Sequence, residues 1–188
     1  ATDSHRLSSS SLEIDPSINI EPIILPKKTI FQLISLIEQS NKKIKISNNK
    51  SKIKFEMSNG VLISKVIDGR FPDYSKVIPK GNDKILQIKL DEFKNSIERV
   101  TTVSSDRKEG LKIAISKDTV QLSVNNPISG EGIENVKANF NSEDLNISFN
   151  SRYLTDIASQ IENQSIVINL KDAGSPVLIN DFSDKNSF

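Results

Sequence analysis

Asp3, Ser4 and His5 are consecutive residues whose side-chain types serve as orienting acid, nucleophile and general base in hydrolases. His5 is also the sole histidine of the chain. A catalytic triad needs these side chains to converge on one another, and adjacent residues cannot easily stack in that arrangement. We therefore expect no catalytic residues here and no enzymatic activity.

The other polar residues show no catalytic or metal-binding pattern. The 188 residues include no cysteine, which excludes disulfides and thiol catalysis and weakens the case for a structural zinc site. Neither a glycine-rich phosphate loop nor a paired metal-ligand motif is present. We expect no metal and no cofactor.

The composition is typical of a globular protein with a core, since 36% of the residues are hydrophobic and 26% are charged. No apolar run reaches about 18 residues, so we expect no membrane span, and the polar start is unlike a signal peptide. With the lack of cysteine, these features lead us to expect a cytoplasmic protein. The net charge of +1 is no evidence for nucleic-acid binding, which must depend on where the basic residues lie.

A unit of one strand, one helix and three strands recurs at a spacing of about 60 residues. Each copy opens with a short alternating or apolar segment, followed by apolar residues spaced by three and four that predict one helix face. The openings are residues 23–28 with Ile30, Leu33, Ile34 and Ile37; 86–91 with Phe93, Ile97 and Val100; and 145–150 with Leu154, Ile157 and Ile161. Pro26 can occupy the first position of the first helix, and Asp91 can cap the second. Asn150 or Ser151 can cap the third.

Each helix is followed by predicted strands with turn residues between them. The strands are residues 43–47, 52–57 and 61–67 after the first helix, 111–116, 119–124 and 131–138 after the second, and 166–170 and 176–180 after the third. Asn59 and Gly60 between two alternating segments are a typical hairpin signal. The pattern predicts an α+β fold in which helices cover one face of antiparallel sheets.

Pairs of these units would form domains. Residues 71–80, flanked by Pro72 and Pro79, are the predicted linker between pairs. The last copy has two of its three strands, and residues 1–14 resemble the remnant of an earlier copy. Since the chain also begins with Ala1 rather than Met, we expect both ends to be incomplete.

Four segments carry a resemblance to a known family. Residues 1–7 read Ala-Thr-Asp-Ser-His-Arg-Leu, and residues 66–74 read Val-Ile-Asp-Gly-Arg-Phe-Pro-Asp-Tyr. Residues 149–154 read Phe-Asn-Ser-Arg-Tyr-Leu, and residues 175–179 read Ser-Pro-Val-Leu-Ile. In this order they resemble bacterial DNA sliding clamps, the beta subunits of DNA polymerase III.

The resemblance implies the DNA-clamp fold, in which a subunit has three domains of two units each. Two subunits close head to tail into a ring around duplex DNA. Residues 1–72 would be the latter part of the second domain, residues 73–79 the interdomain linker, and residues 80–188 the third domain without its last strand. The first domain would be missing.

The function implied is that of a non-catalytic processivity factor of DNA replication. A clamp that encircles DNA tethers the replicative polymerase and raises its effective concentration at the primer end. A separate clamp loader opens the ring using ATP. The alternative is a peptide-binding adaptor of the same fold that does not encircle DNA. An enzyme of this fold is a third possibility, which no catalytic residues support.

The family also has a pocket between the second and third domains, where polymerases and repair factors insert a short peptide. The matching positions here are Thr2, Ser4, His5, Arg6, Leu7, Pro72, Lys76 and Val77. Ser4 stands where the family usually has Gly, so its side chain could narrow the loop or oppose a positive φ. Some members have Arg at the position of Lys76.

The pocket is expected to be present but incomplete. The Met-Pro-containing tail that completes it in the family is absent after Phe188. For Leu7, Pro72 and Val77, composition alone favours a plain packing role, and the resemblance is what indicates a pocket.

In this family, helices line the inside of the ring and present basic side chains to phosphates. The candidates here are Lys27, Lys28, Lys94, Arg99 and Arg152. Such contacts would be few and independent of DNA sequence. The alternative is that these residues are solvated faces of amphipathic helices.

Two further residues, Thr102 and Val103, align with the face that meets the partner subunit in the homodimer. Their alternative role is to end a helix that packs against its own sheet. Without the first domain, the chain should not close a ring by itself.

Overall fold

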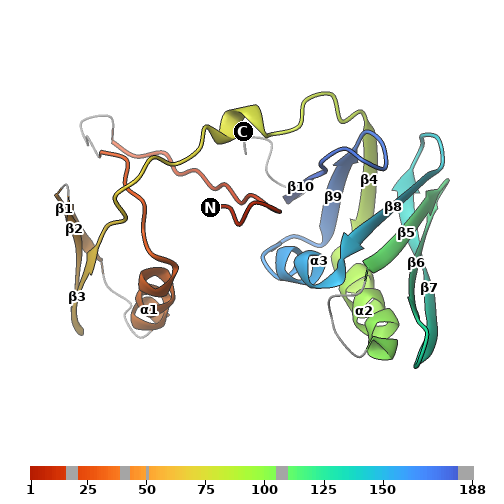
Figure 1. Ribbon diagram of the computed structural model, residues 1–188, viewed down its shortest axis with the longest axis horizontal. Helices are drawn as coiled ribbons and strands as arrows, with labels where there is room; N and C mark the ends of the chain where they lie inside the picture. The colour runs from red at the N-terminus through yellow and green to blue at the C-terminus, as the bar shows by residue number, and fades with distance from the viewer. Residues whose placement is uncertain (16–20, 39–42, 50, 105–109, 182–188) are drawn as a thin grey trace. The chain divides into compact units, whose positions relative to one another are not determined.

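The computed structural model describes residues 1–15, 21–38, 43–49, 51–104 and 110–181. The chain divides into two units (Figure 1). The smaller unit is Glu13–Tyr74, and the larger unit combines Ala1–Leu12 with Ser75–Phe188. The division between Tyr74 and Ser75 falls inside the predicted linker, but the first twelve residues pack with the larger unit.

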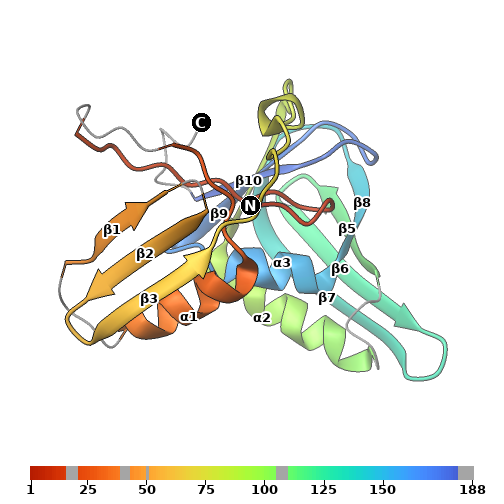
Figure 2. The same ribbon diagram turned by 60° about the vertical axis from the view of Figure 1, so that its left-hand side comes forward.

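In the smaller unit, helix α1 (Lys27–Glu38) lies against one face of an antiparallel sheet ordered β1 (Lys45–Asn48), β2 (Lys52–Met57) and β3 (Gly60–Lys65) (Figure 2). The predicted hairpin is confirmed, because Met57 pairs with Gly60 across the turn. Strand β2 alternates, so that Ile53, Phe55 and Met57 form the buried core of this unit.

The opening of the smaller unit differs from the prediction. Residues 23–28 do not form a strand: a single bridge joins Ile24 to Ile67, and α1 begins at Lys27, directly after Pro26. The predicted apolar face is also only partly buried. Thr29 is buried and Leu33 and Leu36 pack against the core, whereas Ile30, Ile34 and Ile37 are 37%, 48% and 38% exposed. The residues that meet the sheet are therefore 29, 33 and 36, a stripe rotated from the predicted one.

The larger unit contains two copies of the predicted repeat. The first is β4 (Lys84–Lys89), α2 (Leu90–Val100), β5 (Gly110–Ser116), β6 (Thr119–Asn126) and β7 (Gly130–Phe140). The second is β8 (Leu145–Asn150), α3 (Ser151–Ala158), β9 (Ser165–Leu170) and β10 (Leu178–Asp181). Within the described residues the second copy has two strands after its helix, as predicted.

One seven-stranded antiparallel sheet joins the two copies in the order β10-β9-β4-β7-β6-β5-β8. The long strand β7 connects its halves: residues 130–137 pair with β6, and the last residues, Ala138–Phe140, pair with β4. Helices α2 and α3 pack against each other beside this sheet (Figure 1). The α+β class with helices and antiparallel sheets is confirmed.

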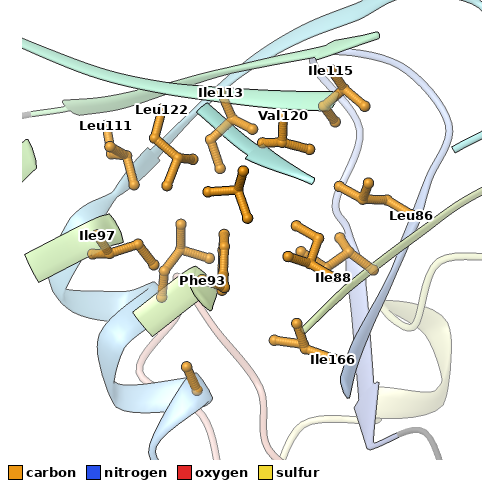
Figure 3. Packing of buried hydrophobic residues seen from close by; sticks show 14 of the residues in the cluster. Leu86, Ile88, Phe93, Ile97, Leu111, Ile113, Ile115, Val120, Leu122 and Ile166 are labelled. Atoms are coloured by element: carbon orange, nitrogen blue, oxygen red, sulfur yellow. The ribbon is translucent and has the colours of Figure 1, made fainter. Parts of the chain in front are cut away.

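The core of the larger unit lies between these helices and the sheet. Phe93 and Ile97 of α2 point toward Leu111, Leu122 and the other buried residues of β5 and β6 (Figure 3). Helix α2 and β7 approach closely: a Cβ added to Gly132 would lie 2.8 Å from the Val100 carbonyl oxygen. A side chain at position 132 would therefore push the helix away from the strand.

The helix starts were predicted with mixed success. The Asn150 side chain caps α3 by accepting from the Arg152 amide, as expected. Asp91 is not a cap: Lys89 precedes α2 without a side-chain cap, and Asp91 lies inside the first turn, where a carboxylate favours the helix dipole. Ile161 lies beyond the end of α3 and packs against the core from the following segment.

Candidate functional site

The N-terminal residues of the larger unit form a tight turn. Thr2 and Leu7 are paired by a bridge, and the Thr2 hydroxyl donates to the Arg6 carbonyl at 2.8 Å. The Asp3 carboxylate accepts from the backbone amides of His5 and Arg6 at 3.1 and 3.0 Å. Ser4, where glycine was expected from the resemblance, adopts a left-handed conformation with φ 75°. The serine is accommodated in this turn, at the backbone cost that a non-glycine residue has there.

Arg6 fastens this turn to helix α3. Its Nη1 donates to Asp156 Oδ2 at 2.8 Å and its Nε to Asp3 Oδ2 at 3.0 Å. The guanidinium also lies 4.5 Å from the centre of the Tyr153 ring, in the geometry of a cation–π interaction. Tyr153 and Asp156 are one helical turn apart, so both face the same side of α3.

The contacts of Arg6 and Asp3 shift the pKa values of both side chains. The hydrogen bond to Asp156 is the main cause that raises the pKa of Arg6, although desolvation opposes it. For Asp3, desolvation is the largest influence and acts upward, but the backbone amides of Arg6 and His5 together with the Arg6 guanidinium lower its pKa overall. Both groups are therefore charged at neutral pH.

The arrangement does not resemble a catalytic site. The Asp3 carboxylate is occupied by Arg6 and by backbone amides, and the His5 ring stacks on Tyr153 with 6.3 Å between ring centres. Across the described ranges, no group of three or more His, Asp or Glu side chains could hold a metal ion. Nor is any helix there long and apolar enough to cross a lipid bilayer.

A second predicted segment lines an open hollow of about 490 Å³. Its walls are residues 75–80, which include Lys76 and Val77, and Pro176 from the segment between β9 and β10. The Val77 side chain is 61% exposed and therefore available to a ligand.

The Pro176 side of the hollow is shaped by Asp172. Its Oδ1 accepts from the amides of Gly174 and Ser175 at 2.9 and 2.7 Å, and its Oδ2 accepts from the Ser175 hydroxyl at 2.8 Å. The hydrogen bond from that hydroxyl is the main cause that lowers the pKa of Asp172. This turn leads the chain into Pro176.

The structure thus places some of the predicted pocket residues beside residues that the sequence did not indicate. His5 and Arg6 meet Tyr153 and Asp156, while Lys76 and Val77 meet Pro176. Pro72 belongs to the smaller unit. Tyr153, Asp156 and Pro176 were not among the predicted residues, although the 149–154 and 175–179 segments carried the signal of a family match.

The five candidate DNA-facing residues have different surroundings. Lys27 and Lys28 are exposed in the first turn of α1, and Arg152 is exposed in the first turn of α3. Lys94 on α2 is half-buried.

Arg99 is exposed but paired. Its Nε and Nη2 donate to the two carboxylate oxygens of Glu134 at 2.7 and 3.2 Å, and Nη2 also donates to the Ser96 hydroxyl at 2.9 Å. The hydrogen bonds that Arg99 donates to Glu134 are the main cause that raises the pKa of Arg99 and the main cause that lowers the pKa of Glu134. The charge of Arg99 is thereby largely balanced within the larger unit.

Thr102 and Val103 lie in the 3-10 helix η2 (Thr101–Val103) that follows α2. The Thr102 hydroxyl donates to the Arg99 carbonyl at 2.7 Å, and Val103 packs against the core. Both residues therefore have a role at the end of the helix in their own unit.

The chain matches two family models in succession. Residues 1–73 match the central domain of the DNA polymerase III beta subunit, and residues 75–187 match its C-terminal domain. A beta sliding clamp of Caulobacter vibrioides is 35% identical over 182 residues, which are 96% of this chain and 49% of that protein.

Solved structures agree with this match. A DNA polymerase III subunit beta sliding clamp of Bartonella birtlesii superposes with a TM-score of 0.88 at 38% identity, covering 93% of this chain and 50% of the other. A second structure of the clamp from that organism, bound to griselimycin, gives 0.81 at 40% identity over 85% of this chain and 43% of the other. The chain therefore spans about half the length of these relatives.

Proposed function

The chain belongs to the family of bacterial beta sliding clamps, the beta subunits of DNA polymerase III, and from this premise we propose that the full-length protein is a ring that encircles duplex DNA. The ring is a homodimer that holds the replicative polymerase at the primer end. It acts as a topological tether, which raises the effective concentration of the polymerase without performing chemistry. It needs no cofactor of its own and works in the cytoplasm with a separate clamp loader.

The family membership carries this proposal, and the two-copy architecture of the larger unit supports it. In the proposed division, residues 1–72 belong to the second clamp domain, 73–79 to the linker and 80–188 to the third domain. Thr102 and Val103, at the end of α2, are proposed to contact the partner subunit.

DNA contact is proposed to be electrostatic and independent of sequence. Lys27, Lys28 and Arg152 are exposed basic residues in first turns of helices. Lys94 adds a half-buried basic residue on α2, whereas Arg99 contributes less because Glu134 already balances its charge. A few such contacts permit sliding, since phosphate attraction carries no sequence information.

The residues proposed for partner binding are Thr2, Ser4, His5, Arg6, Leu7, Pro72, Lys76 and Val77. In the larger unit, the hollow offers apolar surface from Val77 and Pro176, and Lys76 is also part of its lining. An apolar surface with few polar groups fits a short peptide from the polymerase or clamp loader. Griselimycin, bound by the Bartonella clamp, is proposed as a ligand of this chain too.

Retention on DNA tests the ring. The full-length protein would be loaded onto nicked circular DNA by a clamp loader, and the DNA would then be linearised. A ring stays on circles and leaves rapidly after cutting. Equal binding to circular and linear DNA, or binding to neither, would contradict the ring and favour a peptide-binding adaptor of the same fold.

Griselimycin binding tests the ligand site separately. Val77→Asp places a carboxylate in the hollow and should weaken binding by at least tenfold, since an apolar contact is replaced by a charge that must lose water. Val61→Asp is the matched control, because Val61 is 56% exposed on β3 of the other unit. Equal affinity of the Val77 variant and the wild-type protein would exclude the hollow as the griselimycin site.

A further inference from the structure

Asn82 joins the two walls of the hollow. Residues 75–80 form one wall, and Asn82 comes two positions after them, just before β4. Its Nδ2 donates to the carbonyl of Pro176 at 3.1 Å and to the carbonyl of Asn169 at 2.9 Å. Pro176 forms the opposite wall, and Asn169 belongs to β9. One side-chain amide therefore holds Pro176 against the sheet and beside residues 75–80.

The orientation of this amide is determined by its surroundings. Reversing it would place the side-chain oxygen against two carbonyl oxygens, which repel it, so the nitrogen must face them. The opposite atom, Oδ1, is buried and has no hydrogen-bond partner among the described residues. A buried acceptor without a partner costs free energy, so it persists only where the rest of the arrangement offsets that cost.

The backbone before Asn82 is suited to this placement. Gly81 has φ 83°, a left-handed conformation that glycine adopts without strain, and the chain turns there from the wall of the hollow into β4. The neighbouring turn at Asp172 shapes the residues before Pro176 but does not connect them to residues 75–80. Through its side chain, Asn82 connects the segment that follows residues 75–80 to Pro176 in the opposite wall.

We propose that Asn82 is a positioning residue that sets the distance between Pro176 and residues 75–80, and with it the affinity of the hollow for its ligand. This inference rests on the proposed function of the hollow as a ligand site. Asn82 does not itself contact the ligand: it acts through Pro176.

The test compares two Asn82 variants of the full-length protein with the wild type, using griselimycin as the probe. Asn82→Ala removes both hydrogen bonds, and we expect the Kd of griselimycin to rise about fivefold. Asn82→Asp keeps the shape but turns a carboxylate oxygen toward the two carbonyls, so at neutral pH its Kd should rise at least as much. Burial against two carbonyl oxygens disfavours the charged carboxylate and so raises its pKa. On acidification toward about pH 5, the carboxyl group therefore gains a proton that it can donate to a carbonyl, and the Kd should move back toward that of the wild type.

Hydrogen exchange gives a second readout that does not depend on the ligand. In Asn82→Ala, the amides of Ser175 and Val177 should exchange faster, while those of β5 and β6 stay unchanged. Asn146→Ala is the matched control, because Asn146 is an exposed asparagine of β8, at the opposite edge of the sheet. It should alter neither the Kd nor the exchange of the Pro176 segment.

The outcomes separate this inference from the function on which it rests. If Val77→Asp weakens griselimycin binding while both Asn82 variants bind as tightly as the wild type, the ligand site stands and the positioning role is wrong. If the wild type does not bind, the proposed ligand site itself fails and takes the positioning role with it. Weaker binding by Asn82→Ala with faster exchange at Ser175 and Val177 supports the inference.

Discussion

The Arg6 guanidinium donates to the Asp156 carboxylate at 2.8 Å, although 150 positions separate the two residues in sequence. This ion pair fastens the N-terminal turn to helix α3 beside Tyr153. The two side chains are 36% and 47% exposed, so water screens their attraction and the pair stabilises the protein only modestly. Its main consequence is positional: His5 and Arg6 are held against Tyr153 rather than free in solution.

We first predict a measurable coupling between Arg6 and Asp156. In urea unfolding, Arg6→Gln, Asp156→Asn and the double variant should give a coupling free energy of about 0.5 kcal/mol, typical of a partly exposed pair. The coupling should shrink in about 1 M salt, where charges are screened. Arg6→Gln with Glu131→Gln is the control pair, because Glu131 is an exposed carboxylate on β7 rather than on α3. Additive effects of Arg6→Gln and Asp156→Asn at low salt would show that the contact does not operate in solution.

The Arg99–Glu134 pair predicts a pH dependence of stability. The hydrogen bond from Arg99 lowers the pKa of Glu134 in the folded protein below its ordinary value of 4.5. Because the pKa of Glu134 is lower in the folded protein, the pair stabilises the fold fully at pH values above the pKa of Glu134 in the unfolded chain. This stabilisation is lost as the pH falls through the pKa of Glu134 in the folded protein. The wild type should therefore exceed Glu134→Gln in free energy of unfolding at neutral pH, and the difference should vanish in acid. A difference that stays constant from neutral to acid pH would contradict the pairing.

The salt dependence of DNA binding should show how much each basic residue contributes to neutralising phosphates. For the full-length protein and a short duplex, Lys94→Ala and Arg152→Ala should each reduce the slope of log K against log salt concentration by about 0.9 if the residue neutralises one phosphate. Arg99→Ala should reduce it less, because Glu134 already balances that charge. Glu131→Gln is the control: it removes a charge from β7, the strand that carries Glu134, without touching the Arg99–Glu134 pair. Unchanged slopes in all three alanine variants would mean that these side chains are only solvated.

Close packing of α2 on β7 predicts that Gly132 does not tolerate a side chain. In Gly132→Ala, the new Cβ would lie 2.8 Å from the Val100 carbonyl oxygen, and relieving that contact should cost about 1–3 kcal/mol of unfolding free energy. Gly110→Ala is the matched control: Gly110 also lies in a strand, and its added Cβ would meet nothing within 4 Å. Equal urea midpoints for the two variants would contradict the close approach.

Local pattern and short motifs determined the class, the repeat and the family from the sequence alone. Alternation in residues 52–57 and 145–150 predicted β2 and β8 residue for residue, since burial of one face requires a period of two. Spacing of three and four placed Phe93 and Ile97 on the buried face of α2. The motif at residues 66–74 indicated a clamp, and the family matches confirm it.

Tertiary structure decided which residues meet. Periodicity assigned Ile30, Ile34 and Ile37 to a buried face, but the register of α1 on its sheet buries Thr29 and packs Leu33 and Leu36 instead. No local pattern relates Arg6 to Asp156, Asn82 to Pro176 or Arg99 to Glu134, because each contact depends on how distant segments pack. Sequence periodicity records which side of an element avoids water, whereas partners, distances and charge balance arise only when those sides are brought together.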